Sequence, residues 1–410
     1  MSTISHLPLQ KSVGRWPVER RPVLDWLVNE TRSQRFLDNL LVDLCERLVS
    51  EGIPVGRSSL HLRIQHPQWQ GARILWHPGV EEAHIDTFDY DVDTTELFLR
   101  RPATEIYNGA TEVRQSLAEP SAEVDRYPLY EELRRDGFTD YVAWPMEHTW
   151  GKRHVITFAT KQPKGFSDYD ISYLKDLLPA IALTSEIRMK NAMARTLLET
   201  YVGRHASAEI LAGATTRGSG KTVSAAIMIC DLRDFTALSD LWPRDDVIEI
   251  LNAYFDALCD PVEAYGGEIL KLMGDGLLAI FPLSDPNACA NLLRAIDNGR
   301  QRIEQLNDRL AKDEKPLLRY GVGVHVGDVM YGNIGSRKRL DFTAIGPAVN
   351  VASRLEDLTK ILKRPVLLSS DFVDLLGPSS NFDELGLHAL RGLEVPVSVF
   401  GLANGNRGVS

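Results

Sequence analysis

Apolar runs in the second half of the chain predict buried strands that lead to acidic residues. The segment AAIMICDLRDFT opens with an apolar run at Ala225 and reaches Asp231 at the end of that run, which is typical of a buried strand followed by a polar turn into a helix. Farther along, GGEILKLMGDGLLAIF predicts a β-hairpin whose tip carries Asp275 between two glycines. If the two segments are neighbours in one sheet, both carboxylates lie at the same edge. Such a pair suits divalent cations that hold a phosphorylated substrate, because hard cations take oxygen ligands.

The first half of the chain predicts an α+β domain with a central sheet. Apolar residues at three- and four-residue steps predict one amphipathic helix from Pro22 to about Gly52. After this helix, segments with strand periodicity alternate with segments with helix periodicity, which is typical of an α+β domain. We expect strands at Ser58–Gln65, Gly71–His77 and in TDYVAWPM and HVITFATK, helices near Thr94–Arg101 and Tyr127–Gly137, and an irregular polar stretch from Asn108 to about Arg126.

A long helical connector is expected between the two halves. From Asp168 to Ala212 the sequence has few helix breakers apart from Pro179 and Gly203. Its apolar stripe has imperfect heptad spacing, so this helix either pairs with its twin in a dimer or lies on its own domain. The TRGSGKT segment lacks the first glycine of a phosphate-binding loop. We therefore interpret residues 218–222 as a flexible linker.

Composition limits the class of protein. A chain of 410 residues is long enough for two domains and a connector. The net charge of −10 argues against a broad nucleic-acid-binding face. The sequence has neither a membrane-spanning apolar run nor a signal-peptide core, so we expect a cytoplasmic protein that does not bind membranes. The four cysteines lack CxxC spacing and are expected to be reduced, with no disulfide or zinc site: Cys45, Cys230, Cys259 and Cys289.

Taken together, the motifs of the second half resemble a class III nucleotidyl cyclase domain. The segment YGVGVHVGDVMYGNIGSRKRLDFTAIGPAVNVASRLE, from Tyr320 to Glu356, is similar to the second half of that domain, and DLRDFT and KLMGDG are similar to its first half. The likeness covers about Val223 to Leu402 and implies a ferredoxin-like α+β fold. It also implies an adenylate cyclase, which converts ATP to 3′,5′-cyclic AMP and pyrophosphate.

The resemblance assigns metal and phosphate contacts to residues in the first part of this domain. Asp231 and Asp275 correspond to the two aspartates that hold two Mg²⁺ or Mn²⁺ ions per site. One ion activates the ribose 3′-hydroxyl and the other binds the β- and γ-phosphates. Phe235 and Thr236 lie in the turn whose main-chain N–H groups suit triphosphate oxygens. Asp234 stands where the family often has glycine, and aspartate tolerates a left-handed backbone better than most residues.

Base choice is assigned to Lys271 and Thr343. In adenylate cyclases that resemble this chain, a lysine at the first position and an aspartate or threonine at the second recognise adenine, whereas guanylate cyclases place glutamate and a small polar residue there. A lysine only donates hydrogen bonds, so it suits N1 of adenine and opposes the N1–H of guanine. Asp341 competes for the second role, but alignment through Gly346 favours Thr343. Guanylate cyclase remains the alternative activity.

The resemblance assigns three further residues. Asn350 and Arg354 are four residues apart, on one face of the expected helix, and would orient the ribose and stabilise negative charge on the transferring phosphate. Arginine suits that task because its guanidinium stays charged and matches phosphate oxygens. Arg391 lies near a position that contributes a basic phosphate contact in relatives. The basic run at residues 337–339 is interpreted as a solvated hairpin tip.

The resemblance also implies an assembly. In the family the site lies between two cyclase domains, one giving the metal aspartates and the other the base-reading, asparagine and arginine groups. This chain carries both sets, so a head-to-tail homodimer would form two equivalent sites. Two other classes of protein compete with this one: a sensor whose cyclase half only binds or dimerises, and a cyclic-dinucleotide synthase. The second would need a Glu-Phe pair after the GGE at Gly266, which the chain lacks.

The end of the first half resembles GAF-type sensor domains. The segment HVITFATKQPKGFSDYDISYLKDLLPAIAL is similar to their last strand, cap and exit helix, with Ser167 as N-cap. The likeness covers about Pro22 to Leu183 and implies a pocket for an unknown effector. Aromatic residues and histidines such as Tyr107 and His61 are candidate ligand contacts, although core and surface roles are preferred. The expected organisation is an arm (1–20), a GAF-like regulatory domain (21–167), a connector (168–222), a cyclase domain (223–402) and a tail (403–410).

Overall fold

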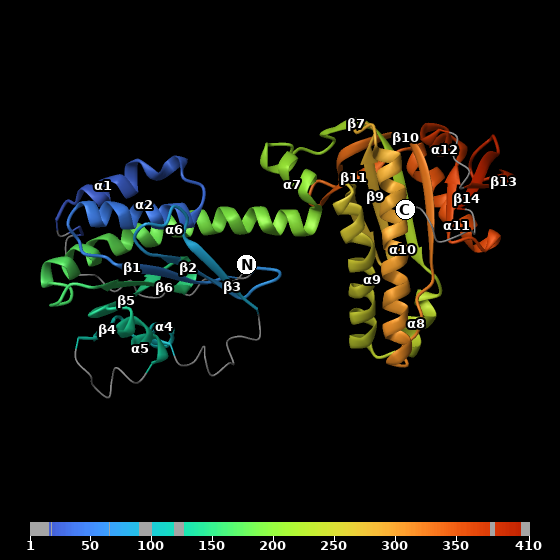
Figure 1. Cartoon of the computed structure of the whole chain (residues 1–410). Helices are drawn as coiled ribbons and strands as arrows, with labels where there is room; N and C mark the ends of the chain where they lie inside the picture. Colours follow the sequence, from blue (N-terminus) through green and yellow to red (C-terminus); the bar gives the residue numbers. More distant parts are fainter. Residues whose placement is uncertain are drawn as a thin grey trace. The chain divides into compact units, whose positions relative to one another are not determined.

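The chain divides into two compact units, Met1–Leu197 and Leu198–Ser410, both drawn in Figure 1. The computed structural model describes residues 16–17, 19–64, 66–89, 101–118, 127–377 and 382–402, apart from the side chain of Trp150. The expected N-terminal arm up to residue 15, the helix expected near Thr94 and the tail from residue 403 lie outside the described residues.

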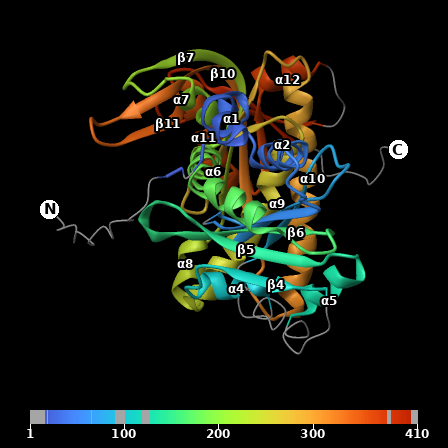
Figure 2. The same ribbon diagram turned by 90° about the vertical axis from the view of Figure 1, so that its left-hand side faces the viewer.

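The first unit is built around a six-stranded antiparallel sheet with the strand order β3-β2-β1-β6-β5-β4. Figure 2 shows β4, β5 and β6 of this sheet side by side. The elements in chain order are α1 (Pro22–Asn29), the 3-10 turn η1 (Thr31–Ser33), α2 (Leu37–Ser50), β1 (Arg57–Arg63), β2 (Gly71–Trp76), β3 (His84–Phe88), α4 (Pro102–Tyr107), β4 (Val113–Ser116), α5 (Pro128–Arg135), β5 (Asp140–Glu147), the 3-10 turn η4 (Thr149–Gly151), β6 (Arg153–Thr160) and α6 (Asp168–Val202).

Alternation along the central strands gives this sheet two apolar faces. Val142 and Trp144 of β5 belong to a core shared with α1, α2 and α6. Tyr141 and Ala143, on the same strand, belong to a second core shared with α4 and α5. Successive side chains of a strand point to opposite faces, so the helices sandwich the sheet. Figure 1 shows α1 and α2 on the opposite side of the sheet from α4 and α5.

Most expected elements of this unit are confirmed, including the four strands and helix α5. The expected cap of α6 is also present: the Ser167 hydroxyl accepts a hydrogen bond from the backbone N–H of Asp170 at 3.2 Å. The single helix from Pro22 to Gly52 is wrong. The chain breaks between α1 and α2, where the carbonyls of Thr31 and Gln34 accept hydrogen bonds from the Arg188 guanidinium instead of from a continuing helix.

Two strands of this unit do not follow from the sequence pattern. The stretch expected to be irregular contains β4, whose polar residues pair with β5 at the edge of the sheet. No pattern predicts β3, which pairs with β2. Both strands lack a continuous apolar run because they lie at the two edges of the sheet, where one side of the strand needs no partner.

The second unit contains an eight-stranded sheet with the order β13-β14-β12-β10-β7-β9-β8, and β11 pairs with β10 off this path. Its elements are α7 (Arg204–Leu211), β7 (Gly220–Leu232), α8 (Phe235–Leu241), α9 (Arg244–Ala264), β8 (Glu268–Met273), β9 (Gly276–Pro282), α10 (Ala288–Lys312), β10 (Tyr320–Gly335), β11 (Leu340–Ile345), α11 (Pro347–Leu362), β12 (Val366–Ser369), α12 (Ser370–Leu376), β13 (Phe382–His388) and β14 (Val397–Leu402).

Strand β7 is covered on both faces. Met228 and Cys230 share a core with α9 and α10, which lie side by side in Figure 1. Ile227 and Ile229 share a second core with α7 and α11. Covering both faces explains why this strand is a continuous apolar run rather than an alternating one. The apolar strand expected at Ala225 is therefore confirmed.

The segment interpreted as a flexible linker at residues 218–222 is partly strand. Strand β7 begins at Gly220, three residues before the expected start of the domain, and Gly220 pairs with Gly332 of β10. A Cβ on Gly332 would lie 2.3 Å from the carbonyl oxygen of Ser219. Glycine at these positions therefore allows the two strand backbones to approach closely. The flexible-linker interpretation did not predict this strand pairing.

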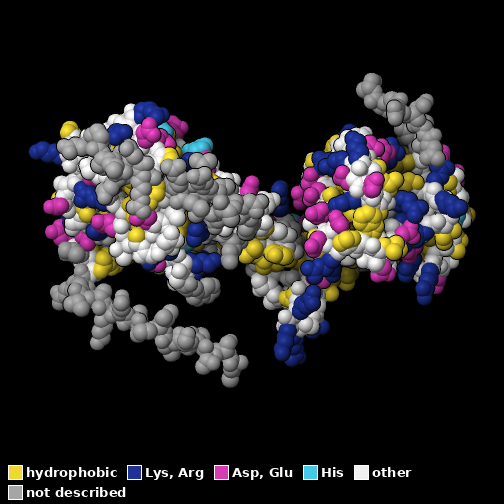
Figure 3. All heavy atoms as spheres, turned by 90° about the horizontal axis from the view of Figure 1, so that it is seen from below, with side chains coloured by type: hydrophobic (Ala, Val, Ile, Leu, Met, Phe, Trp, Pro, Cys, Tyr) yellow, Lys and Arg dark blue, Asp and Glu magenta, His cyan; other side chains and the backbone are white. Residues whose placement is uncertain are grey.

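The surface and the cysteines of the described chain agree with the composition. Figure 3 shows acidic and basic side chains interspersed over one face of the second unit. All four cysteines are free thiols, and Cys45, Cys230 and Cys289 are buried. Among the helices of the described ranges, none has an apolar stretch long enough to cross a membrane.

Helix α11 packs against β10 without room for a side chain on Gly323. A Cβ on this residue would lie 2.2 Å from the carbonyl oxygen of Ala352 and 2.3 Å from the backbone nitrogen of Glu356. Both atoms belong to the helix backbone, so the whole helix would have to move. This close approach fixes the height of α11 above the sheet.

We expect Gly323→Ala to lower the free energy of unfolding of the second unit by about 3 kcal/mol, because overpacking against backbone cannot be relieved by a rotamer change. The matched control is Gly299→Ala in α10, where the new Cβ would meet the flexible Leu258 side chain at 3.1 Å. The control should change stability by no more than about 1 kcal/mol, since alanine also favours the helix. Urea unfolding of the two variants tests this, and equal stabilities would refute the packing argument.

Candidate active site

Asp231 and Asp275 lie at one edge of the second sheet. Asp231 is the penultimate residue of β7 and pairs with Gly276, the first residue of β9. Asp275 sits in the two-residue turn between β8 and β9, where Gly274 has a φ of 67°. A side chain on Gly276 would begin 3.2 Å from Oδ1 of Asp231. The strand neighbours and the hairpin tip expected from the sequence are therefore confirmed, and the two acids are adjacent.

The two carboxylates repel each other. Asp231 is partly buried, and burial followed by the charge of Asp275 raises its pKa above the usual value. Lys360 of α11 and Arg233 act in the opposite direction. The positive charge supplied by the chain itself therefore does not balance this edge of the sheet, and a bound cation would relieve the repulsion.

A buried ion pair lies beside the acidic pair. The Arg233 guanidinium contacts the Glu356 carboxylate at 3.0 Å, and the two side chains are 13% and 6% exposed. A Cβ on Gly321 would lie 1.8 Å from Nη2 of Arg233, so glycine makes room for this guanidinium. Burial raises the pKa of Glu356 and Asp231 raises it further, while Arg233 and Lys360 lower it. Glu356 is thus within electrostatic range of Asp231.

Sequence reasoning missed this pair. Arg233 lies two residues after Asp231, and Glu356 lies two residues after Arg354. In both motifs the sequence assigns a role to the neighbouring residue, Asp231 or Arg354, and assigns none to Arg233 or Glu356. The sequence feature that could have predicted the pair is charge. An arginine at the end of a buried strand and a glutamate on the apolar side of a helix each need an oppositely charged partner once they are buried.

The turn after β7 has the conformation expected for Asp234. This residue has φ 58° and ψ 26°, in the left-handed region, and precedes the first residue of α8. Its carboxylate accepts a hydrogen bond from Arg319 at 2.6 Å. The charge that would oppose a phosphate is therefore already paired with a guanidinium. Phe235 packs against the core and Thr236 is exposed.

Lys271 and Thr343 lie on neighbouring elements of the same unit. The Lys271 ammonium on β8 pairs with the Asp341 carboxylate on β11 at 2.5 Å, and both side chains are partly open to solvent. Thr343 lies two residues farther along β11 and is partly buried. Residues two apart on a strand share a face, so Asp341 and Thr343 are both on the side that Lys271 approaches.

The remaining candidates lie on α11 and before β14. Asn350 is exposed near the start of α11, and Arg354 follows one turn later. The Arg354 guanidinium is 3.6 Å from the Asp357 carboxylate, and its buried Nε has no hydrogen-bond partner among the described residues. Arg391 is exposed in a turn. The basic run at residues 337–339 lies between β10 and β11 and is exposed, as expected of a hairpin tip.

Hydrogen bonds and ion pairs do not join all the candidate residues into one cluster. Among the described residues, none of these contacts joins Asp231 or Asp275 to the other candidates, which are Lys271, Thr343, Asn350, Arg354 and Arg391. The structure therefore brings together the acidic pair, and separately places Lys271 beside β11. It does not assemble all the candidates around one point.

Two carboxylates are enough to hold Mg²⁺ or Mn²⁺ in a phosphate-binding site. Among the described residues, no group of three or more histidine, cysteine, aspartate or glutamate side chains is arranged to hold a metal ion. Mg²⁺ is usually bound by one or two carboxylates together with water and substrate phosphates, and not by an all-protein cage. Asp231 and Asp275 supply this donor set, and their mutual repulsion favours a cation between them.

Comparisons with known proteins agree with the motifs. Residues 219–403 match the protein-family model described as Adenylate and Guanylate cyclase catalytic domain. The chain is 30% identical over 175 residues to Adenylate cyclase 1 of Rhizobium meliloti (strain 1021), which covers 42% of this chain and 26% of that protein. It is 34% identical over 170 residues to Adenylate cyclase of Anabaena cylindrica, which covers 40% of this chain and 33% of that protein.

The solved structure of a bacterial light-regulated adenylyl cyclase has 29% sequence identity and a TM-score of 0.40, covering 44% of this chain and 91% of that chain. The match to the two curated relatives spans 26% and 33% of their lengths. The family match, the motif order and the paired acids all fall within the same part of the chain. Residues 219–403 are therefore a class III adenylate and guanylate cyclase catalytic domain.

Proposed function

We propose that the protein is an adenylate cyclase that converts ATP to 3′,5′-cyclic AMP and pyrophosphate. The observation that carries this proposal is the adjacency of Asp231 and Asp275 at one sheet edge inside the cyclase domain. Both relatives described above bear the name adenylate cyclase. The reaction forms a bond between the ribose 3′-oxygen and the α-phosphorus. It breaks the bond from that phosphorus to the oxygen that bridges to the β-phosphate, and the 3′-hydroxyl proton is released.

Asp231 and Asp275 would hold two divalent cations, Mg²⁺ or Mn²⁺. When bound, these cations lower the pKa of the 3′-hydroxyl and neutralise phosphate charge. The turn at Phe235 and Thr236 would bind the triphosphate through its main-chain N–H groups. The Arg319 guanidinium, paired with the Asp234 carboxylate, would offset part of the negative charge that opposes this contact.

Lys271 and Thr343 would select adenine. The ammonium donates to N1 of adenine, and the threonine hydroxyl can accept from the N6 amino group. The Asp341 carboxylate, which pairs with Lys271, would hold the ammonium in position. One observation favours guanylate cyclase as the second candidate: the same partly exposed carboxylate could accept from the N1–H and N2 amino group of guanine.

The catalytic unit would be a head-to-tail homodimer. Among the described residues of one chain, no hydrogen bond or ion pair joins the acidic pair to Asn350 or Arg354, and a second copy would bring these two residues to the acidic pair of the first. The Arg354 side chain is 39% exposed, so part of it is open to a group from a second copy. Asn350 would orient the ribose, Arg354 would stabilise charge on the transferring phosphate, and Arg391 is proposed as a phosphate contact.

The first unit would be a GAF-like regulatory domain that acts through the connector. Its sheet leads through β6 into α6, a helix of 35 residues. Five large apolar or aromatic side chains of α6 are exposed and fall on one heptad register, which suits pairing with a second copy of the helix. They are Tyr169, Leu183, Ile187, Leu197 and Tyr201.

We expect the purified protein, supplied with Mn²⁺, to produce cyclic AMP from ATP much faster than cyclic GMP from GTP. Asp275→Asn should reduce the rate by about a thousandfold or more, since charge stabilisation of the transferring phosphate depends on this carboxylate. The control is Asp308→Asn, an exposed position on α10, which should leave the rate unchanged. Chromatographic separation of the products measures both rates.

A preference for GTP would overturn the Lys271 assignment and favour the guanylate cyclase alternative. No product from either nucleotide would favour a domain that only binds or dimerises. Full activity of Asp275→Asn would refute the role of the acidic pair.

Mixing two inactive variants tests the shared site. Asp231→Ala and Arg354→Ala remove different halves of the site, so a mixed dimer would keep one intact site. Random exchange of subunits gives half mixed dimers, and we therefore expect about a quarter of the wild-type activity after mixing. Each variant alone should remain inactive. Mixed dimers that form, as shown by two affinity tags, without recovering activity would exclude a site built from two chains.

A further inference from the structure

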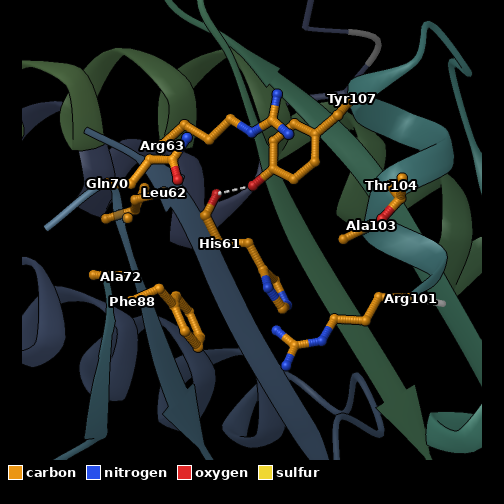
Figure 4. A pocket seen from close by; sticks show the side chains of 11 residues that line it. His61, Leu62, Arg63, Gln70, Ala72, Phe88, Arg101, Ala103, Thr104 and Tyr107 are labelled. Atoms are coloured by element: carbon orange, nitrogen blue, oxygen red, sulfur yellow. Dashed lines mark hydrogen bonds between the residues drawn. The ribbon is translucent and has the colours of Figure 1, made fainter. Parts of the chain in front are cut away.

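Polar groups around the cavity of the first unit are in contact with one another. Figure 4 shows this cavity, where the Tyr107 hydroxyl donates to the His61 carbonyl at 3.2 Å. The Arg63 guanidinium lies over the same tyrosine ring, 3.9 Å from its centroid. These contacts need no ligand. The second unit, by contrast, contains a buried pair of charges, Arg233 and Glu356, to which the proposed reaction gives no role.

This pair lies on the same face of the sheet as Asp231. Ile227 and Ile229 of β7 belong to the core that this strand shares with α11. Side chains two residues apart on a strand share a face, so Asp231 also lies on the face that α11 covers. Arg233, just after the end of β7, reaches Glu356 of α11 at 3.0 Å. One of the two proposed metal ligands and the ion pair are therefore neighbours.

A glycine on the adjacent strand makes room for the guanidinium. Gly321 of β10 is directly opposite Asp231 in the strand register. A Cβ on Gly321 would lie 1.8 Å from Nη2 of Arg233 and 2.4 Å from Oγ1 of Thr359 on α11. The guanidinium therefore fills the space between β10 and α11 that a side chain would otherwise occupy. The backbone N–H of Arg233 donates to the carbonyl of Arg319 at 2.7 Å, so both ends of this residue are held.

Burial makes the contact a constraint on position. The Arg233 and Glu356 side chains are 13% and 6% exposed. A buried ion pair adds little net stability, because the loss of hydration offsets the attraction, yet removing one partner leaves the other charge unpaired at a high cost. The two residues must therefore stay together. Because one follows β7 and the other belongs to α11, the end of the strand and the helix must stay together as well.

We propose that Arg233 and Glu356 are positioning residues for the cyclase reaction. Their contact fixes Asp231, two residues before Arg233, relative to Arg354, two residues before Glu356. This role rests on the proposed function, in which Asp231 holds a cation and Arg354 stabilises charge on the transferring phosphate. The pair itself would not touch the substrate. It acts through its neighbours, since a displacement of about 1 Å in a reactive group can lower a rate about a hundredfold.

The test measures kcat and KM for ATP with Mn²⁺ in the full-length protein. Arg233→Gln and Glu356→Gln should each lower kcat by about tenfold or more and change KM by less than about threefold, because the residues assigned to the base and the triphosphate are untouched. Arg233→Lys keeps the charge but not the planar fork, so it should lose less activity than Arg233→Gln.

The direction of the effects separates positioning from a direct effect of charge. Arg233→Gln removes a positive charge near Asp231 and Glu356→Gln removes a negative one, so a direct electrostatic effect would change the Mn²⁺ affinity in opposite directions. Loss of position should lower the Mn²⁺ affinity in both variants. The double variant, Arg233→Gln with Glu356→Gln, leaves no buried charge unpaired and should fold. Its kcat should be about as low as that of either single variant, because the contact acts as one unit.

The matched control is Arg364→Gln. It removes another contact between an arginine and a carboxylate in the same unit, to Asp383 at 3.1 Å, and should leave kcat unchanged. Urea unfolding shows that each variant is folded under the assay conditions. If a single variant does not fold, Arg233→Lys and the double variant decide. Wild-type kcat in the folded variants, opposite changes in Mn²⁺ affinity, or recovery of wild-type kcat in the double variant would overturn the proposal.

Failure of the proposed reaction is recognised separately. If the wild type makes neither cyclic AMP nor cyclic GMP, the reaction fails, and isothermal titration calorimetry of Mn²⁺ with a non-hydrolysable ATP analogue still tests the pair. A lower affinity in both Arg233→Gln and Glu356→Gln would then support the positioning role, and wild-type affinity in both would refute it. An active wild type with equally active variants would refute the positioning role and leave the reaction standing.

Discussion

Repulsion between two carboxylates at the edge of one sheet is the constraint on which the second unit depends. Strand pairing places Asp231 opposite the first residue after the Asp275 turn, and partial burial makes the charged form of Asp231 unfavourable. A fold optimised for stability alone would not keep such a pair. A bound cation, as proposed, would relieve this repulsion, and the end of β7 and the tight turn between β8 and β9 hold the two acids at the edge where it would bind.

The buried ion pair connects this edge to helix α11. Arg233 extends from the end of β7 and Glu356 from the helix, while Gly321 and Gly323 let the helix approach the sheet. In the proposed dimer, Asp231 would serve one site and Arg354 the other. The contact between Arg233 and Glu356 would then fix the distance between Asp231 and Arg354 within one chain. The two sites of the dimer would in this way be held at a constant distance from each other.

The sequence predicts those parts of the structure that depend on local chemistry. The hairpin tip at Asp275 follows from its flanking glycines, and the buried strand before Asp231 follows from its apolar run. The left-handed turn at Asp234 also agrees with residue type. Contacts between distant segments do not follow in this way. The Arg233–Glu356 pair joins residues far apart in the chain, and the break after α1 depends on hydrogen bonds from Arg188 in a distant helix.

The most direct test of the central claim is the binding of Mn²⁺ to the full-length protein in the presence of a non-hydrolysable ATP analogue, measured by isothermal titration calorimetry. We predict that the wild type and Asp308→Asn bind Mn²⁺ with equal affinity. Asp231→Asn and Asp275→Asn should each bind it at least about tenfold more weakly, because each removes one of two charged oxygen ligands. Mn²⁺ affinity that is the same in the wild type and in both of these variants would contradict the claim that the two acids form a cation site.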